Sequence, residues 1–240
     1  MDKRRFFLSA KVAKTATPQD CWWLTVVYGP QADQEKVEFL DELRQFRMTA
    51  DGPWVLCGDF NMIYRTEVKS NDCLDRRCMR RFRAFIDAAE LEELHLVGRQ
   101  FTWSSERDQP TLERLGRVFA TAGWLQAHLN HVLRALSTDC SDHCPLLLMA
   151  NVVPWAKKRF RFEPHWIKFP GLMEAVESAW SATLLHADPF HVLDYKLRNV
   201  ARVLKSWSDK KIGSVRMQLA LVREAIVRLD VAQESRSLSL

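Results

Sequence analysis

The spacing of apolar residues alternates between strand-like and helix-like along residues 21–153. Residues 22–28 combine β-branched and aromatic side chains and end at a Gly-Pro turn signal, which predicts a strand. Residues 54–57 are wholly apolar, as in a strand that is buried on both sides. Residues 35–48 instead repeat apolar positions with a helical period, and one face of that helix would carry Phe39, Leu40, Leu43 and Phe46.

The same alternation continues toward residue 153. A second helix is predicted over residues 80–94, and short strands over residues 101–103, 117–120 and 146–149. Strands that alternate with helices along the chain are typical of an α/β sandwich. Residues 21–153 are therefore expected to form one α/β domain.

The last part of the chain has a purely helical pattern over residues 172–240. Apolar residues recur at three- and four-residue steps along residues 193–207 and 212–231, with a break at residues 209–213. This pattern predicts two helices whose apolar seams are buried, either against each other, against the sandwich, or in a second copy. The seam is formed by Leu193, Leu197, Val200, Leu204, Trp207, Ile212, Val215, Leu219, Val222, Ile226 and Leu229.

Two segments lack a clear periodicity. Residues 1–20 are expected to be poorly ordered. Residues 154–171 mix cations, aromatic residues and prolines, which is typical of a linker. Its cations Lys157, Lys158, Arg159 and Arg161 could contact a phosphate backbone, although a solvated linker explains them equally well.

The composition restricts the class of protein only loosely. The net charge of +5 over 240 residues permits a polyanionic partner such as DNA or RNA without requiring one. The six cysteines include no Cys-x-x-Cys pair, and no secretory signal is visible, so a reduced intracellular protein is expected. The longest apolar run, residues 146–153, is too short to cross a bilayer, so no membrane partner is expected.

Gly58-Asp59-Phe60-Asn61 follows the apolar strand at residues 54–57. A carboxylate at the end of a strand can polarise a water molecule or hold a divalent cation. Asn61, two residues later, could donate to a phosphate oxygen from the same side of an extended chain. Taken alone, the motif is equally compatible with ordinary turn residues.

Ser141-Asp142-His143 precedes the strand predicted at residues 146–149. Histidine is the natural general base near neutral pH, and the adjacent carboxylate of Asp142 could bind a metal ion or water. By itself this segment is also compatible with an ordinary loop.

In this order the two motifs resemble the endonuclease/exonuclease/phosphatase superfamily. The resemblance implies a four-layer α/β sandwich that hydrolyses phosphoesters with Mg²⁺ or Mn²⁺. By match, Asp59 would orient the attacking water, Asn61 would hold a phosphate oxygen, and Tyr28 would contact the phosphate. Asp142 would lie beside the metal, together with Asp59, and His143 would act on the phosphate or in proton transfer.

Further segments resemble endonuclease domains of plant LINE-type (non-LTR) retrotransposons. They are residues 101–103, 110–114 and 161–166, and residues 205–211 resemble the connector toward the reverse transcriptase. The resemblance implies DNA as the partner and the nucleus as the site of action. A lipid or inositol phosphatase of the same superfamily is the alternative substrate class.

Two departures from the family pattern indicate a weak or inactive enzyme. In the family, an aspartate orients the catalytic histidine. In the matching segment here, Arg114-Leu115-Gly116-Arg117, Gly116 stands in the place of that aspartate. Residues 1–20 contain no glutamate, whereas the family's main metal ligand is a glutamate in an early strand. The sequence therefore predicts a partial sandwich that lacks its N-terminal part, and leaves open a non-catalytic nucleic-acid-binding or interaction role.

Overall fold

The computed structural model describes residues 1–13, 21–105, 107, 109–138, 140–150, 160–183 and 188–235. The chain divides into two compact units. The first comprises residues 1–152 together with residues 225–240, and the second comprises residues 153–224. Each unit is described by itself below.

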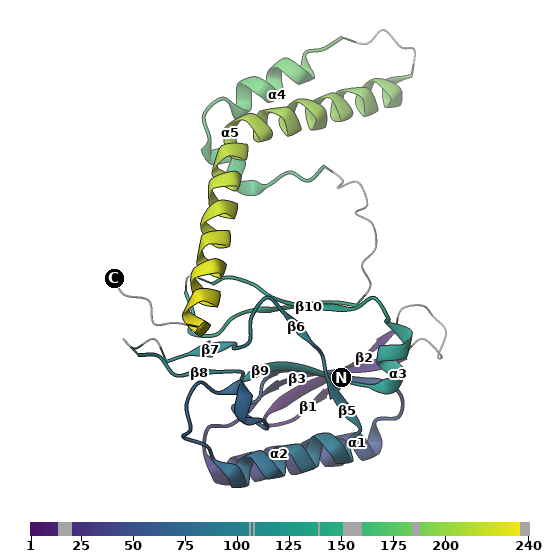
Figure 1. The fold of residues 1–240 in the computed structure, drawn as a ribbon. Helices are drawn as coiled ribbons and strands as arrows, with labels where there is room; N and C mark the ends of the chain where they lie inside the picture. The colour runs from purple at the N-terminus through teal and green to yellow at the C-terminus, as the bar shows by residue number, and fades with distance from the viewer. Residues whose placement is uncertain are drawn as a thin grey trace. The chain divides into compact units, whose positions relative to one another are not determined.

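A six-stranded sheet forms the centre of the first unit (Figure 1). Its strand order is β1 (Asp2–Lys3), β2 (Phe7–Ala13), β3 (Cys21–Tyr28), β4 (Trp54–Asp59), β9 (Gly116–Thr121) and β5 (Leu91–Glu93). Only β3 and β4 pair in parallel, and helix α1 (Asp33–Thr49) makes the crossover between them. The strands predicted at residues 22–28 and 54–57 are thereby confirmed, and both lie inside the sheet.

The expectation that residues 1–20 are poorly ordered is wrong for residues 2–3 and 7–13. Strand β2 pairs with β3 along its whole length, from Phe7 opposite Val27 to Ala13 opposite Cys21. Ser9, which is fully buried, shares a hydrogen bond of 2.7 Å with the hydroxyl of Thr25. A polar residue on the buried face hides the alternation that marks a strand, so the apolar pattern did not reveal it. Residues 14–20 lie outside the described residues.

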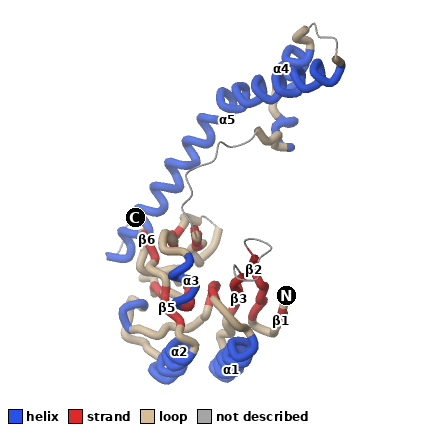
Figure 2. Tube along the Cα trace, turned by 90° about the vertical axis from the view of Figure 1, so that its right-hand side faces the viewer, coloured by secondary structure: helices blue, strands red, loops and turns tan. Residues whose placement is uncertain are grey.

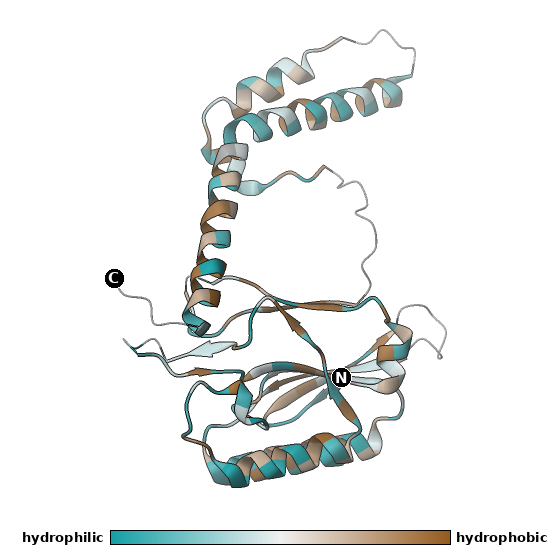
Figure 3. Cartoon of the chain, viewed as in Figure 1, coloured by the Kyte–Doolittle hydropathy of each residue, from teal (hydrophilic) through white to brown (hydrophobic). Residues whose placement is uncertain are grey.

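Helices α1 and α2 (Arg76–Ala88) lie side by side on one face of the sheet (Figures 1 and 2). Their apolar faces bury a cluster dominated by phenylalanines, which are almost fully inaccessible to solvent. It includes Phe39, Phe46, Phe60, Phe82, Phe85 and Phe119. Apolar and polar residues alternate along both helices (Figure 3), and the buried ones are apolar, as an amphipathic helix requires.

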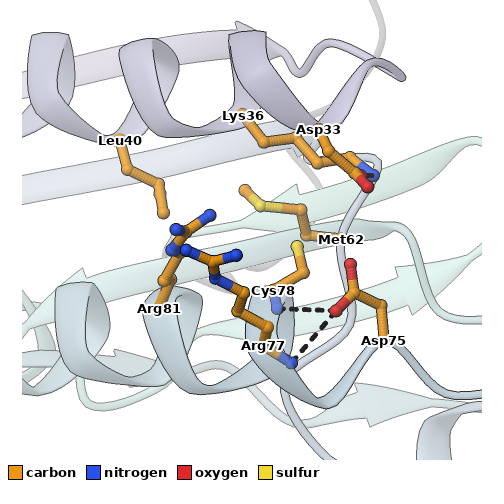
Figure 4. A pocket seen from close by; sticks show the side chains of 8 residues that line it. All are labelled: Asp33, Lys36, Leu40, Met62, Asp75, Arg77, Cys78 and Arg81. Carbon is orange, nitrogen blue, oxygen red and sulfur yellow. Dashed lines mark hydrogen bonds and ion pairs between the residues drawn. The ribbon is translucent and has the colours of Figure 1, made fainter.

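Helix α2 begins and ends earlier than the predicted range of residues 80–94. The carboxylate of Asp75 accepts hydrogen bonds from the backbone N–H groups of Arg77 and Cys78, at 3.0 and 2.9 Å, which caps the first turn (Figure 4). The helix ends before Glu90, whose φ of 53° is left-handed, and the chain then enters β5. The helical period of the apolar residues could not indicate this reversal.

A cavity of about 160 Å³ lies between α1 and α2. Figure 4 shows the cations Lys36, Arg77 and Arg81 around it, together with the carboxylates of Asp33 and Asp75. Lys36 pairs with Asp33 at 3.1 Å. The cavity contains none of the residues that the motifs single out.

A three-stranded sheet covers part of the other face of the central sheet. Its order is β11 (Leu146–Met149), β10 (Val132–Ala135) and β6 (Leu96–Val97), and the short helix α3 (Ala122–Ala127) packs beside it. The core between the two sheets is formed by Val55, Leu94, Leu96, Val118, Ala120, Trp124 and Leu133. A helical layer and two sheet layers confirm the α/β class and a partial sandwich.

A two-stranded hairpin, β7 (Trp103–Ser104) and β8 (Leu112–Glu113), lies beside the second sheet. The predicted strand at residues 101–103 is thus shorter and shifted. The loop between β4 and α2 contains the 3₁₀ helix η2 (Thr66–Val68), and Lys69 after it forms a β-bridge with Glu113 of β8. A small cluster holds this region together, formed by Ile63, Val68, Met79 and Leu115.

The second unit contains the 3₁₀ helix η3 (Pro164–Lys168), α4 (Leu172–Trp180) and most of α5 (Pro189–Ser235). Its core is formed by Trp166, Leu172, Leu204 and Ile212, with the Trp166 and Trp207 rings 6.1 Å apart. In the part of the chain that the structure describes, no helix combines the length and the apolar content needed to cross a bilayer.

The prediction of two helices separated at residues 209–213 is wrong, because α5 is continuous across this segment. A glycine in a helix costs only about 1 kcal/mol relative to alanine, which is too little to end a helix without a proline. The seam is also buried only in part: Leu204 is 3% exposed, but Leu197 and Leu219 are 54% and 46% exposed.

Candidate active site at the ends of the central strands

Asp59 is the last residue of β4, at the centre of the six-stranded sheet. It pairs in register with Tyr28 at the end of the parallel strand β3, and with Gly116 at the start of the antiparallel strand β9. Three strands therefore bring Asp59, Tyr28 and Gly116 to the same edge. The prediction that the first motif lies at the end of a buried strand is confirmed.

Two glycines are required around Asp59 because the backbones approach too closely for a side chain. Gly58 has a φ of +134°, and a Cβ added there would lie 2.1 Å from the carbonyl oxygen of Val27. A Cβ on Gly29 would lie 2.2 Å from the carbonyl oxygen of Phe60. The chain after β3 therefore packs directly on the turn that follows Asp59.

Asn61 fixes this turn. Its φ of 48° is left-handed, a conformation that asparagine tolerates better than most residues. Its side-chain N–H donates to the carbonyl oxygen of Gly29 at 2.6 Å, and its backbone N–H donates to Asp59 Oδ1 at 2.9 Å. The predicted role of Asn61 in holding a phosphate oxygen stays a prediction, and the geometry gives its amide a structural role as well.

His143 faces Asp59, with 3.8 Å between Nε2 and Asp59 Oδ2. This oxygen is inaccessible to solvent and has no hydrogen-bond partner within the described residues. The separation exceeds a direct hydrogen bond, so both groups keep hydrogen-bonding capacity for a ligand. The convergence of Asp59 and His143, expected because each flanks a strand end, is confirmed.

Burial raises the pKa of Asp59 above its ordinary value, and the hydrogen bond from the Asn61 N–H and the nearby His143 oppose this effect. The side chain is only 12% exposed. A carboxylate with a raised pKa is a better proton acceptor than an ordinary one. Asp59 is therefore suited to accept a proton from a bound water molecule.

A pocket of about 400 Å³ opens beside these two groups. Its polar lining includes Asp59, His143 and Tyr28, whose side chain is 69% exposed. The remaining wall is largely apolar and is formed by Cys57, Val118, Cys144, Leu146 and Leu148. Burial raises the pKa of the Cys57 thiol to about 11, so this cysteine stays protonated and is not a nucleophile.

Asp142 does not line this pocket. Its Oδ2 accepts a hydrogen bond from the indole N–H of Trp103 at 2.8 Å. It lines a second cavity of about 190 Å³, which it shares with His143 and Arg99. His143 lines both cavities. The two carboxylates predicted to bind one metal ion are separated, because Asp59 lines the first cavity and Asp142 the second.

The described side chains do not form a metal site. No group of three His, Cys, Asp or Glu residues that could hold a metal ion occurs among them. Of the predicted ligands, Asp59 offers one unpartnered oxygen, and Asp142 Oδ2 is engaged by Trp103. Mg²⁺ binds through carboxylates and substrate phosphates with several waters, and a single buried carboxylate oxygen facing an imidazole does not fit it.

Gly116, at the position where the family has its histidine-orienting aspartate, lines the pocket together with His143. Its N–H donates to the hydroxyl of Thr102 at 2.9 Å, and the carbonyl oxygen of Thr102 accepts the N–H of Cys144 at 2.8 Å. Thr102 thus joins β9 to the His143 loop. Sequence reasoning missed this role, since a buried threonine in a short apolar segment carries no signal of it.

A second group missed by sequence reasoning lies on the helical side of β9. Arg117, whose side chain is fully buried, donates to Glu93 at 2.5 Å, and Tyr64 donates to the same carboxylate at 2.7 Å. Two further nitrogens of Arg117 have no hydrogen-bond partner in the described part of the molecule. This ion pair ties β9, which carries Gly116, to β5 and to the segment after Asn61.

The sequence also predicts nucleic-acid-binding cations within residues 157–161. Lys157, Lys158 and Arg159 lie outside the described residues. Arg161 is exposed and belongs to the second unit. Of the aromatic residues beside it, Phe162 packs on Trp166 with ring centroids 5.5 Å apart.

The profile of the Endonuclease/Exonuclease/phosphatase family matches residues 4–143. Among solved structures, the endonuclease domain of TRAS1, a telomere-specific non-LTR retrotransposon, is 17% identical with a TM-score of 0.45. The alignment covers 60% of this chain and 62% of that one.

The 3′ phosphatase NExo from Neisseria, bound to a product DNA hairpin, is 18% identical with a TM-score of 0.44, covering 60% of this chain and 64% of its own. Beta toxin from Staphylococcus aureus, with bound magnesium ions, is 12% identical with a TM-score of 0.38, covering 61% and 54%. The chain thus spans less than two thirds of the length of these structures. No curated protein sequence matches it.

Proposed function

The chain belongs to the endonuclease/exonuclease/phosphatase family, and from this premise we propose that it is a retrotransposon-type DNA phosphodiesterase domain whose own hydrolysis is weak. The observation that carries the proposal is the pair of Asp59 and His143, which face each other at 3.8 Å beside a pocket of about 400 Å³. Phosphoester hydrolysis needs a proton acceptor and a proton donor that reach the same ligand. A buried carboxylate with a raised pKa and a facing imidazole can supply them.

In this proposal each group has one task. The Asp59 carboxylate accepts a proton from the attacking water, because its raised pKa makes it a stronger base than an ordinary aspartate. His143 Nε2 donates to a phosphate oxygen or to the leaving group, and the exposed Tyr28 hydroxyl donates to a second phosphate oxygen. Tyr28 and His143 alone would then meet the charge that develops on the phosphate.

Weak hydrolysis follows from what these residues do not supply. The family is generally dependent on divalent metals, and the described side chains form no metal site. Gly116 also offers His143 no carboxylate acceptor to fix its orientation. In serine proteases, where an aspartate orients the catalytic histidine in the same way, loss of that aspartate lowers kcat about 10⁴-fold.

Support for a retrotransposon origin, and so for DNA as substrate, comes from the sequence motifs. The segments 101–103, 110–114, 161–166 and 205–211 resemble endonuclease domains and connectors of plant LINE-type elements. The net charge of +5 is compatible with a DNA partner. The same combination favours DNA over a lipid or inositol phosphate.

A nucleic-acid-binding role without hydrolysis is the second candidate. The observation that favours it is the absence of a metal-ligand cluster from the described residues. It would use the same pocket and Tyr28, with His143 as a donor to a phosphate.

A plasmid-nicking assay distinguishes the two candidates. The purified chain, Asp59→Ala and His143→Ala are incubated with supercoiled plasmid in Mg²⁺ or Mn²⁺, and binding to a labelled DNA duplex is measured in parallel. We expect DNA binding by all three proteins, with trace nicking by the unmodified chain that both variants abolish. Robust metal-dependent nicking would contradict the weak activity proposed here, and absence of DNA binding would contradict the substrate.

A further inference from the structure

The segment 99–101 holds the carboxylate of Glu234, which lies 135 positions from Arg99 in the sequence. The backbone N–H of Gln100 donates to the two Glu234 oxygens at 2.9 and 3.2 Å, and the N–H of Phe101 donates to Oε1 at 3.1 Å. Arg99 Nε lies 3.5 Å from the same oxygen. Residues 225–240 belong to the first unit, so the contact lies within one compact body.

Arg99 makes a second ion pair, with Asp230 at 2.8 Å. Its side chain is only 10% exposed, and that of Glu234 is 11% exposed. One guanidinium therefore faces two carboxylates from the end of α5. Burial raises the pKa of Asp230, Arg99 lowers it, and Glu234 raises it further, so the second carboxylate is not fully compensated.

The donors of this segment are held in place independently of Glu234. The side chain of Gln100 donates to the carbonyl oxygen of Glu67 at 2.6 Å. The carbonyl oxygen of Gln100 accepts a hydrogen bond from Arg114 Nε at 2.5 Å. Because both sides of the Gln100 peptide are anchored, its N–H and that of Phe101 stay directed at the same point.

Two adjacent backbone N–H groups and a guanidinium are the donors that bind an oxyanion, and they do not distinguish a carboxylate from a phosphate. The segment lies beside the candidate active site: Arg99 lines the cavity of about 190 Å³ that also contains Asp142 and His143. Asp230 lines the same cavity from the end of α5.

We infer that Arg99 and the N–H groups of Gln100 and Phe101 form a phosphate-binding site beside His143, occupied in this structure by the chain's own Glu234. The inference rests on the proposed function, since the phosphate would be that of a DNA strand whose neighbouring phosphate lies at His143. Asp230 and Glu234 then act as an internal competitor, and DNA binding requires the acidic end of α5 to leave the site.

The test neutralises the competitor without changing its shape. In Asp230→Asn/Glu234→Gln, both side chains keep their size and lose their charge. Glu174→Gln/Asp209→Asn is the matched control, because it removes the same charge from exposed positions of α4 and α5. A third protein adds Arg99→Gln to the first variant. Because both carboxylates are already neutral there, the loss of Arg99 leaves no carboxylate without its cation.

Two ligands are titrated against each protein: inorganic phosphate, followed by the midpoint of thermal unfolding, and a labelled DNA duplex, followed by fluorescence anisotropy at fixed salt. We expect Asp230→Asn/Glu234→Gln to bind the duplex about tenfold more tightly than the control, which corresponds to about 1.4 kcal/mol. Phosphate should raise its unfolding midpoint more than that of the control, and Arg99→Gln should remove both gains.

The outcomes separate this site from the proposed function. A gain equal to that of the control, or one that survives Arg99→Gln, overturns the site. A phosphate response that depends on Arg99, without tighter DNA binding, supports an oxyanion site and overturns DNA as its ligand. If the double variant does not fold, Glu234→Gln alone gives the same comparison, because it removes the carboxylate that the backbone N–H groups hold.

Discussion

The two faces of the six-stranded sheet are covered to different extents. On the helical face, α1 and α2 bury Phe60, Phe82 and Phe119 completely. On the other face the three-stranded sheet covers β4 and β9 but leaves Val26 and Tyr28 exposed by 48% and 69%. The candidate active site lies on this second face, where the cover ends. The closed face thus fixes the strands, and the open face leaves their ends accessible to a ligand.

The largest expected effect compares one side chain from each face. Phe119→Ala removes a ring that contacts Phe60, Phe82 and Tyr64, and should destabilise the first unit by about 3–5 kcal/mol. Val26→Ala should cost about 0.5 kcal/mol or less, because that side chain is half exposed. Urea unfolding followed by tryptophan fluorescence measures both. Similar losses for the two variants would show that the open face is covered in solution.

The second effect concerns the buried ion pair that supports β9 from the helical side. Glu93→Gln leaves the fully buried guanidinium of Arg117 without its carboxylate, which should cost about 3 kcal/mol. Glu92→Gln, at the exposed neighbouring position of β5, is the control and should change stability by less than about 0.5 kcal/mol. Equal unfolding midpoints in urea for the two variants would mean that the ion pair contributes nothing.

The third effect has the opposite sign and lies on the open face. Asp59→Asn should stabilise the fold by about 1 kcal/mol at pH 7, because it replaces a carboxylate whose charge is disfavoured by burial with a neutral amide of the same shape. Asn Oδ1 can still accept the Asn61 N–H. The same variant should lose all nicking, so stability and activity would change in opposite directions.

The pH dependence of this gain follows from the sign of the shift. The pKa of Asp59 is raised above its ordinary value of 3.8 in the folded protein. The folded state therefore binds the proton more readily than the unfolded chain, and the cost of the charge appears as pH rises through the folded pKa. The advantage of Asp59→Asn should be full at pH 7 and shrink as the pH falls toward 3.8. An advantage that is constant over this range would contradict the raised pKa.

The predictable elements are those whose buried positions are all apolar. The helical period of Phe39, Leu40, Leu43 and Phe46 gives α1, and the wholly apolar run before Gly58 gives β4, because full burial leaves an unbroken apolar signal. Strand β2 carries Ser9 on its buried face, and β5 follows a left-handed Glu90, so neither shows a strand pattern. Local periodicity cannot reveal a polar pair such as Ser9 and Thr25.

The candidate site was predictable only where a residue type identifies its own chemistry. Asp59 and His143 were found because each flanks an apolar strand, and their strands, β4 and β11, belong to the two sheets that pack against each other. The turn contact of Asn61 with Gly29 and the pairing of Asp142 with Trp103 depend on loops whose paths the sequence does not specify. The contact of Glu234 with segment 99–101 joins distant parts of the chain, and no local pattern indicates it.

The smallest expected effect is that of Gly116→Asp, which restores the residue type of the family at the edge of the open face. A Cβ at this position would lie 3.4 Å from Thr102 Oγ1 and 3.7 Å from Leu146 Cδ1, which are ordinary contacts, so the fold should change in stability by less than about 1 kcal/mol. The new carboxylate would lie in the pocket with His143 and could orient its ring.

Orientation of His143 is only one requirement for hydrolysis. The described residues still supply no metal-ligand cluster to stabilise the charge on the phosphate. We therefore expect no more nicking of supercoiled plasmid than by the unmodified chain, with Gly116→Ala as the matched variant that adds a Cβ without a carboxylate. A clear gain in nicking by Gly116→Asp that Gly116→Ala does not show would mean that the orientation of His143, and not the metal site, limits this enzyme.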